Sequence, residues 1–279
     1  MEQSIFQYDF IIKGLLGAVF ASITAGLAGT YIVSRRMVFL SGGITHASFG
    51  GIGIGYFIGI NPVIGAAVFG ILSALGVEYL SVRHKIREDS AIGILWAFGM
   101  AIGIIFIYLT PGYSPNLMSY LFGSILTVSN ADITALGIMS VVLILYFLIF
   151  YRAILYISFD ESYARTYSSY VDIFKYLTTS LMALTIVLNI RMAGVVLVLS
   201  LLTIPPNIAM IFTRVYFRIA LWSVIAGFVG TATGYIISYF AGIPVGATII
   251  FTLVIIWVIA KGISQVLLRM RGRDRVKKF

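Results

Sequence analysis

Long apolar stretches alternate with short polar turns along the whole chain. A helix needs roughly 20 mostly apolar residues to cross the hydrocarbon core of a bilayer, and most of these stretches reach that length. We expect nine spans, and we expect the shorter apolar segment 116–129 to be an interfacial or re-entrant piece. The expected spans are 11–34, 42–60, 63–82, 90–110, 131–151, 174–190, 194–212, 218–240 and 246–268.

The composition agrees with an integral membrane protein. The chain has 279 residues, of which 60% are hydrophobic and 10% are charged, and its mean hydropathy is +1.04. Soluble domains carry about 25% charged residues. The first apolar stretch is too long for a signal-peptide core and no basic region precedes it, so we expect it to be retained. We therefore expect an all-α, polytopic fold in one transmembrane domain over 1–279, with no disulfide or thiolate site because the chain has no cysteine.

The basic residues gather on one side of this expected topology. All but three of the 19 Lys and Arg residues fall in alternate loops or in the C-terminal tail. Cytoplasmic loops are enriched in Lys and Arg, so we expect the C-terminus inside and the N-terminus outside. The charge of +9 then reflects membrane orientation, and no nucleic-acid partner is expected. The exceptions are Lys13, Arg191 and Lys261.

One ionisable residue falls deep within an apolar span. His46 lies ten residues after Arg36, which places it roughly 15 Å below the membrane surface. Ionisable side chains at that depth usually face a polar path or a bound ion, and imidazole is a common ligand of transition metals. Ser41 and Thr45 are neutral donors nearby. The alternative is a histidine hydrogen-bonded to a neighbouring helix, since a metal site normally needs three or more donors.

Small residues recur every four positions along the same span. In a helix this spacing makes one face on which a neighbouring backbone can approach closely. His46 borders this face, so we expect it to point into the helix bundle. The small residues are Gly43, Ala47, Gly51, Gly55 and Gly59.

Two prolines, Pro205 and Pro206, are followed by Asn207 within the seventh expected span. Proline removes a backbone donor and frees carbonyl groups, so we expect the helix to be interrupted here. Such a break either lines a transport path or is a packing kink, and we favour the kink.

The longest expected cytoplasmic loop covers 152–175 and is rich in tyrosine. Ser158 or Asp160 can cap a short helix that begins near Glu161. The small residues Ala164 and Ser168 would share one face, which suits a groove on another protein. An amphipathic helix on the membrane surface with aromatic anchors fits the same residues.

Six motifs lie along essentially the whole chain: Gly29 to Met37 with Thr45-His46-Ala47, Glu88 to Ile94, Leu121 to Leu126, Phe159 to Ala164, Val195 to Pro206 and Pro244 to Ile249. In order and spacing, they resemble the motifs of the zinc/manganese/iron ABC-importer permeases.

This resemblance implies a transport subunit, not an enzyme, in the bacterial cytoplasmic membrane. Such a permease works by alternating access, pairs with a second copy of itself and binds cytoplasmic ATPase subunits. It receives a divalent zinc, manganese or iron ion from an extracytoplasmic metal-binding protein and holds no permanent cofactor. His46 becomes a metal-path residue, and 152–175 becomes the coupling loop. The implied ATPase-coupling residues are Phe159, Asp160, Glu161, Ala164 and Tyr167.

The chain departs from the family pattern at one position. The family has an aspartate four residues before the histidine, where both side chains can contact a cation, whereas this chain has Gly42. Either another residue supplies the charge, or the site binds more loosely, or the substrate differs. A permease for a siderophore or cobalamin-like substrate is one alternative, although it usually needs a wider path and a longer chain. A stand-alone channel, which would work without an ATPase, is another.

Overall fold

The computed structural model describes residues 9–112, 129–167 and 170–276, and this part of the chain is helical with no strand. The expected all-α class is confirmed. The segment 116–129, apart from its last residue, lies outside the described residues, as does Ser168. The helices are α1 (Asp9–Ser34), α2 (Val38–Ile58), α3 (Pro62–His84), α4 (Glu88–Leu109), α6 (Asn130–Ile149), α7 (Tyr151–Phe159), α8 (Glu161–Tyr167), α9 (Val171–Phe212), α10 (Tyr216–Ala241) and α11 (Val245–Val276).

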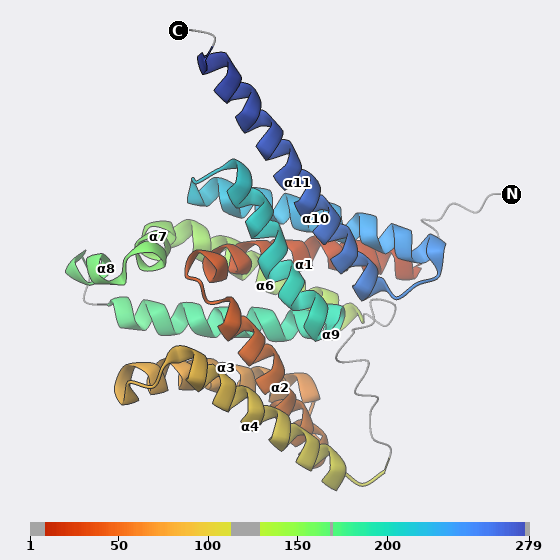
Figure 1. The fold of residues 1–279 in the computed structure, drawn as a ribbon. Coiled ribbons are helices and arrows are strands. Elements are labelled where there is room, and N and C mark those ends of the chain that lie inside the picture. Colours follow the sequence, from red (N-terminus) through yellow and green to blue (C-terminus); the bar gives the residue numbers. More distant parts are fainter. Residues whose placement is uncertain (1–8, 113–128, 168–169, 277–279) are drawn as a thin grey trace, which may run out of the picture.

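Every one of the nine expected spans is helical, but two of them belong to one element. Among the described residues, seven helices are long and apolar enough to cross a membrane, and the protein is a multi-pass membrane protein. The sixth and seventh expected spans are both in α9, whose 42 residues include a non-helical position at Gly194 (φ 77°, ψ 163°). Residues with a Cβ rarely adopt a positive φ, whereas glycine does so readily, and Gly194 therefore permits this sharp change of direction. Figure 1 shows the two limbs of α9 meeting at an angle.

The second limb of α9 corrects one expectation. The helix continues through Pro205 and Pro206 to Phe212, so its break lies at Gly194 and not at the prolines. Pro206 has no N–H to bond the carbonyl of Leu202. A Cβ on Gly29 of α1 would overlap that same carbonyl oxygen, so the α1 backbone packs directly against the group that the proline leaves without a donor.

α9 lies between two groups of helices (Figure 1). The packet of α2, α3 and α4 lies on one side, and α1, α10 and α11 lie on the other. Small side chains let α1 and α9 pack closely, since Ala21, Ala28 and Ala183 are all fully buried. Asn189 of α9 donates a hydrogen bond to the Thr24 hydroxyl of α1 at 3.0 Å, which fixes the two helices in register.

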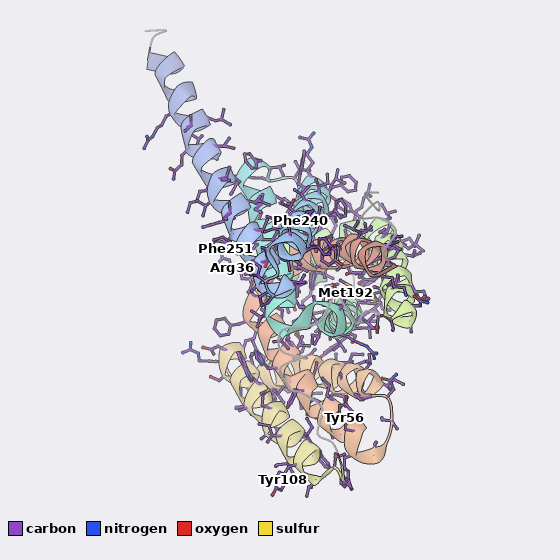
Figure 2. The ribbon with its side chains drawn as sticks, turned by 90° about the vertical axis from the view of Figure 1, so that its right-hand side faces the viewer. Arg36, Tyr56, Tyr108, Met192, Phe240 and Phe251 are labelled. Atoms are coloured by element: carbon purple, nitrogen blue, oxygen red, sulfur yellow. The ribbon has the colours of Figure 1, made fainter. Side chains whose placement is uncertain are left out.

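Large apolar side chains project outward around the bundle (Figure 2). Tyr108 at the end of α4 is 88% exposed, and Phe240 and Phe251 on α10 and α11 are 70% and 67% exposed. Exposed apolar patches of this extent mark contact with lipid or with other proteins. The turn between α3 and α4, the short helix α8 and the turn between α9 and α10 lie toward the same end of the bundle (Figure 1). The expected alternation of basic turns agrees with this arrangement.

Candidate functional site

The helix that carries His46 is fixed by backbone contacts on two sides. Toward α4, a Cβ built on Gly99 would lie 2.5 Å from the Cα of Ala47, and one on Gly43 would lie 2.6 Å from Cγ2 of Ile92. Toward α3, a Cβ on Gly51 would overlap the carbonyl oxygen of Gly65. The expected row of small residues therefore serves two neighbours, and Gly43 and Gly51 have no room for a larger side chain.

The last two members of the row lie at the end of α2. A Cβ on Gly55 would be 2.9 Å from the Cα of Pro62, at the start of α3. Gly59 does not pack against a helix. It has a left-handed φ of 73° and donates its N–H to the preceding turn, so it ends α2.

The imidazole of His46 stacks on the indole of Trp96 from α4. The ring centroids are 4.2 Å apart and the planes are inclined by 8°. His46 is half-buried, and it makes no hydrogen bond or ion pair with any other described residue. The structure therefore does not show the hydrogen-bonded histidine that was the alternative. Stacking uses the face of the ring and leaves both nitrogens without a partner among the described residues. Nothing in the sequence distinguishes Trp96, because an aromatic residue in an apolar span is usually a packing residue.

Gly42 lies one helical turn before His46 and is buried, but its surroundings would accept a Cβ. A Cβ there would meet only Leu199 of α9 at 3.8 Å and Trp96 at 4.0 Å, which is ordinary contact. An aspartate at this position therefore fits at its first side-chain carbon. Phe39, a further turn back on the same helix face, is 72% exposed. This face of α2 is consequently buried at Gly42, half-buried at His46 and exposed at Phe39.

The two neutral helpers expected from the sequence lie away from this face. Ser41 is 1% exposed and donates to the carbonyl of Val38 at 2.7 Å. Thr45 is equally buried and donates to the carbonyl of Ser41 at 2.6 Å. Both hydroxyls thus satisfy backbone groups of their own helix. Across residues 9–112, 129–167 and 170–276 no group of three His, Cys, Asp or Glu side chains is placed to hold a metal ion.

The expected coupling loop contains two helices and the start of a third. α7 was not expected as a separate element, and Asp160 separates it from α8 by accepting a hydrogen bond from the Tyr163 N–H at 2.9 Å. Phe159 and Tyr163 are 64% and 53% exposed. Ala164 is different: it packs against Ile157 within the chain, so it does not offer the outward-facing small surface that we expected. The side chain of Tyr167 lies outside the described part.

Glu161 at the start of α8 faces the bundle instead of the outside. Its carboxylate lies 3.2 Å from Arg35 at the end of α1, 2.9 Å from Arg165 of α8 and 3.2 Å from Lys175 of α9. Lys175 also pairs with Glu78 of α3. Partial burial alone would raise the pKa of Glu161, but hydrogen bonds and charge from Arg165, Lys175 and Arg35 outweigh it and lower the pKa to about 2. Sequence analysis missed this cluster, because its members come from four helices.

The fold and this site define a class: a polytopic all-α membrane protein in which His46 makes no hydrogen bond with another described residue and lies in a helix that glycine contacts hold in place. A family model described as the ABC 3 transport family matches residues 7–263. The chain therefore belongs to the ABC 3 transport family, which confirms the resemblance of its motifs, and it is a permease subunit and not an enzyme.

Three relatives show how far the similarity extends. An uncharacterized membrane protein of Synechocystis is 38% identical over 91% of this chain and 90% of its own. The manganese transport system membrane protein MntC of Listeria monocytogenes is 32% identical over 92% of both chains. A solved structure, PsaBC from Streptococcus pneumoniae in complex with Fab, is 28% identical and covers 92% of both chains with a TM-score of 0.82. The similarity thus extends over nearly the full length.

Proposed function

We propose that this chain is the membrane-spanning permease of an ATP-driven importer for a divalent transition metal ion. The observation that carries the proposal is the half-buried imidazole of His46, which makes no hydrogen bond with any other described residue and shares its helix face with the exposed Phe39. Family membership supports the transport role, and the named manganese relative supports a metal ion as the substrate. An imidazole whose nitrogens make no hydrogen bond is available as a ligand for a metal cation, and ionisable side chains inside a membrane usually have such functional roles.

A second copy of the chain would complete the site. One histidine is too few donors, and the described residues offer no carboxylate beside it. The helix face that carries His46 also carries the exposed Phe39, and Val196 of α9 is 44% exposed. Burying such apolar side chains against the same face of a partner brings two imidazoles together across a two-fold axis. The ion would then pass between the two chains as they alternate between outward-open and inward-open states.

The ATPase subunits would dock at the end of the bundle that carries α8. Phe159 and Tyr163 are exposed there, and aromatic side chains are enriched in protein interfaces. The basic turns gather at this end, so we place it in the cytoplasm together with the C-terminus. The opposite end would receive the ion from an extracytoplasmic binding protein.

Manganese is the first candidate ion on the name of the Listeria relative, and zinc is the second on donor chemistry. Carboxylate oxygens suit manganese, whereas imidazole suits zinc and iron. Because Gly42 supplies no carboxylate, the two arguments point to different metals, and measurement of uptake decides between them.

The test is uptake of manganese, zinc and iron into proteoliposomes that contain the permease, its ATPase and its binding protein. We expect ATP-dependent uptake of one metal, and we expect His46→Ala to lower it about 100-fold, the upper end of what loss of a metal-site partner costs. The melting temperature of His46→Ala should fall by only a few degrees, because the imidazole makes no hydrogen bond with another described residue and loses only its stack on Trp96. Uptake unchanged in His46→Ala would remove the histidine from the path.

Gly42→Asp is the matched gain-of-function variant. Its Cβ meets nothing closer than 3.8 Å, so the chain should accept the side chain and bind the transported ion about tenfold more tightly, the lower end of what partners around a metal site contribute. No uptake of any free metal by either chain, with an active ATPase, would redirect the assignment to a chelated substrate. Uptake without ATP would indicate a channel.

A further inference from the structure

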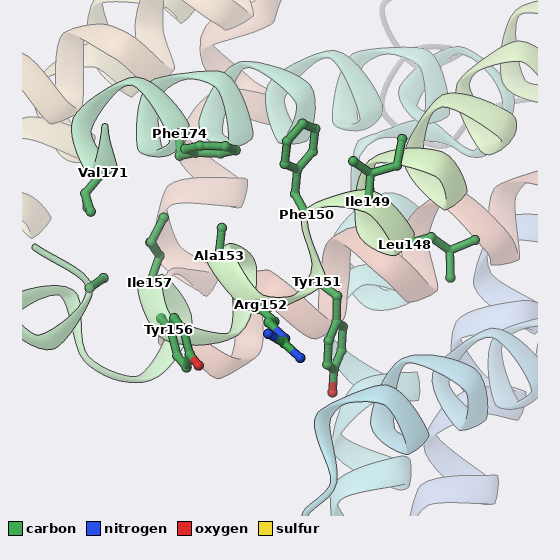
Figure 3. A pocket seen from close by; sticks show the side chains of 11 residues that line it. Leu148, Ile149, Phe150, Tyr151, Arg152, Ala153, Tyr156, Ile157, Val171 and Phe174 are labelled. Atoms are coloured by element: carbon green, nitrogen blue, oxygen red, sulfur yellow. The ribbon is translucent and has the colours of Figure 1, made fainter. Parts of the chain in front are cut away.

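The end of the bundle that carries α8 is loosely packed. A cavity of about 540 Å³ lies between the end of α6, α7 and the start of α9. Figure 3 shows Ala153 and Ile157 of α7 on one side of it and Val171 and Phe174 of α9 on the other. Among the described residues, α8 contributes Ala164 to a small buried apolar cluster with Ile157 and Val171. In contrast to α7, whose Ile154 belongs to the main core, α8 is therefore held weakly by apolar packing alone.

Ion pairs supply the attachment that packing does not. Glu161 contacts Arg35, whose side chain is only 15% exposed and which also donates to the carbonyl of Ile157 at 3.2 Å. Lys175 bridges Glu161 to Glu78, and the side chains of Lys175 and Glu78 are 11% and 10% exposed. Pairs at this depth are screened little by salt, and loss of one partner leaves a charge without compensation.

Two members of this cluster, Arg35 and Glu78, are connected to α2, one through the chain and the other through packing. Arg35 begins the turn into α2, where Arg36 has a left-handed φ of 60°. Glu78 is on α3, whose Gly65 packs directly against Gly51 of α2. A displacement of α8 is therefore passed to the helix that carries His46 by two routes. One route is the covalent turn and the other is close backbone packing, which does not deform gradually.

We propose that Glu161 and Lys175 are positioning residues that tie α8 to α1 and α3 and so transmit movement of α8 to the helix of His46. This inference rests on the proposed function, in which the ATPase contacts α8. Glu161 acts through its inward contacts and not by touching the ATPase. Breaking the tie leaves the ATPase able to bind and hydrolyse ATP but disconnects hydrolysis from transport.

The functional test compares Glu161→Gln and Lys175→Gln with Lys175→Arg, which keeps the charge. In the two glutamine variants we expect the metal transported per ATP hydrolysed to fall about tenfold, a usual size for coupling between sites. ATP hydrolysis itself should stay near the wild-type rate. Lys175→Arg should transport nearly as wild type. Asp172→Asn is the comparison variant, because it removes an exposed carboxylate of α9 that pairs with Arg165 of α8 and reaches neither α1 nor α3.

A second measurement needs no transport. The chain has no cysteine, so spin labels can be placed cleanly at Tyr79→Cys on α3 and Tyr163→Cys on α8, two exposed positions. In lipid nanodiscs the distance distribution between the labels should be narrow in the parent chain and broad in Glu161→Gln. Asp172→Asn should leave it narrow.

The outcomes separate the two proposals. An unchanged label distance in Glu161→Gln overturns the tie. So does a parallel loss of ATP hydrolysis and uptake, which would make Glu161 a docking residue. If the parent chain moves no metal but the distance still broadens in Glu161→Gln, the proposed function is wrong and the anchoring role of Glu161 stands.

Discussion

The two ends of the path from α8 to His46 are held by opposite means. Around α2, glycines bring backbones into direct contact, and Gly51 and Gly99 leave no room for even a methyl group. Around α8, a cavity and a few apolar contacts are supplemented by the charges of Arg35, Glu161 and Lys175.

This difference indicates that α8 can move and that α2, α3 and α4 follow it as one unit. Backbone packing is short-ranged and has one good arrangement, so α2, α3 and α4 behave as a rigid packet. Ion pairs tolerate changes of distance better, because Coulomb energy falls slowly with separation. A movable attachment next to a rigid packet is the arrangement that a transporter needs if a push at α8 is to reach His46.

Glycine substitution breaks the rigid side of this comparison and has the largest expected effect. In Gly51→Ala the new Cβ overlaps the backbone oxygen of Gly65, which cannot swing away as a side chain would. We expect a loss of about 3 kcal/mol, the upper end for overpacked cores. Thermal unfolding of the purified protein measures it. Gly93→Ala on α4 is the control, since nothing lies within 4 Å of its Cβ, and an equal loss there would contradict the packing argument.

Removal of the stacked indole tests how firmly the rigid packet presents its histidine. In Trp96→Ala the imidazole of His46 loses its stacking partner at 4.2 Å. Aromatic pairs contribute about 0.5–1.5 kcal/mol, so we expect metal uptake to fall roughly threefold to tenfold. Trp222→Ala removes an exposed indole on α10 and should not change uptake. If both variants lose uptake equally, the stack has no specific role.

Low pH should weaken the ion pairs that attach α8 to the bundle. The pKa of Glu161 is lowered to about 2 in the folded chain from an ordinary value of 4.5, so its ion pairs stabilise the attachment above about 4.5 and this contribution is lost as pH falls toward 2. Arg35, Arg165 and Lys175 keep their charge there, while the neighbouring carboxylates Glu78 and Asp172 also face the cluster. The label distance between α3 and α8 should broaden over that window. Glu161→Gln, already broad at neutral pH, should change little.

Salt should have the smallest effect and sharpens the same contrast. At 1 M ionic strength the screening length is about 3 Å, yet part-buried pairs are screened much less than exposed ones. We expect a slight broadening of the label distance between α3 and α8, and none between labels placed on α2 and α3. A large effect of salt on α2 and α3 would mean that charge, and not backbone contact, holds the packet together.

The sequence predicted much of the fold because the bilayer imposes simple rules. The expected spans all appear as helices, since apolar runs of about 20 residues leave a membrane-spanning backbone no other way to satisfy its hydrogen bonds. It misplaced the break in α9, because Pro205 and Pro206 are stronger local signals than Gly194, and a transmembrane helix tolerates proline when a neighbour covers the freed carbonyl. The sequence did not predict α7 as a separate helix. It also predicted an outward-facing Ala164, whereas Ala164 is buried in the structure.

The sequence by itself determined the class of protein, the helical spans, the family motifs and the presence of one histidine among small residues, because these depend on local composition and spacing. The residues that surround that histidine and the ion pairs that hold α8 depend on the tertiary structure. Residues far apart in the chain form the stack of His46 on Trp96 and the surroundings of Gly42. The same is true of the ion pairs that connect Glu161 to α1 and α3. Helical periodicity orients a side chain within its own helix, but which neighbour it meets depends on how the helices pack.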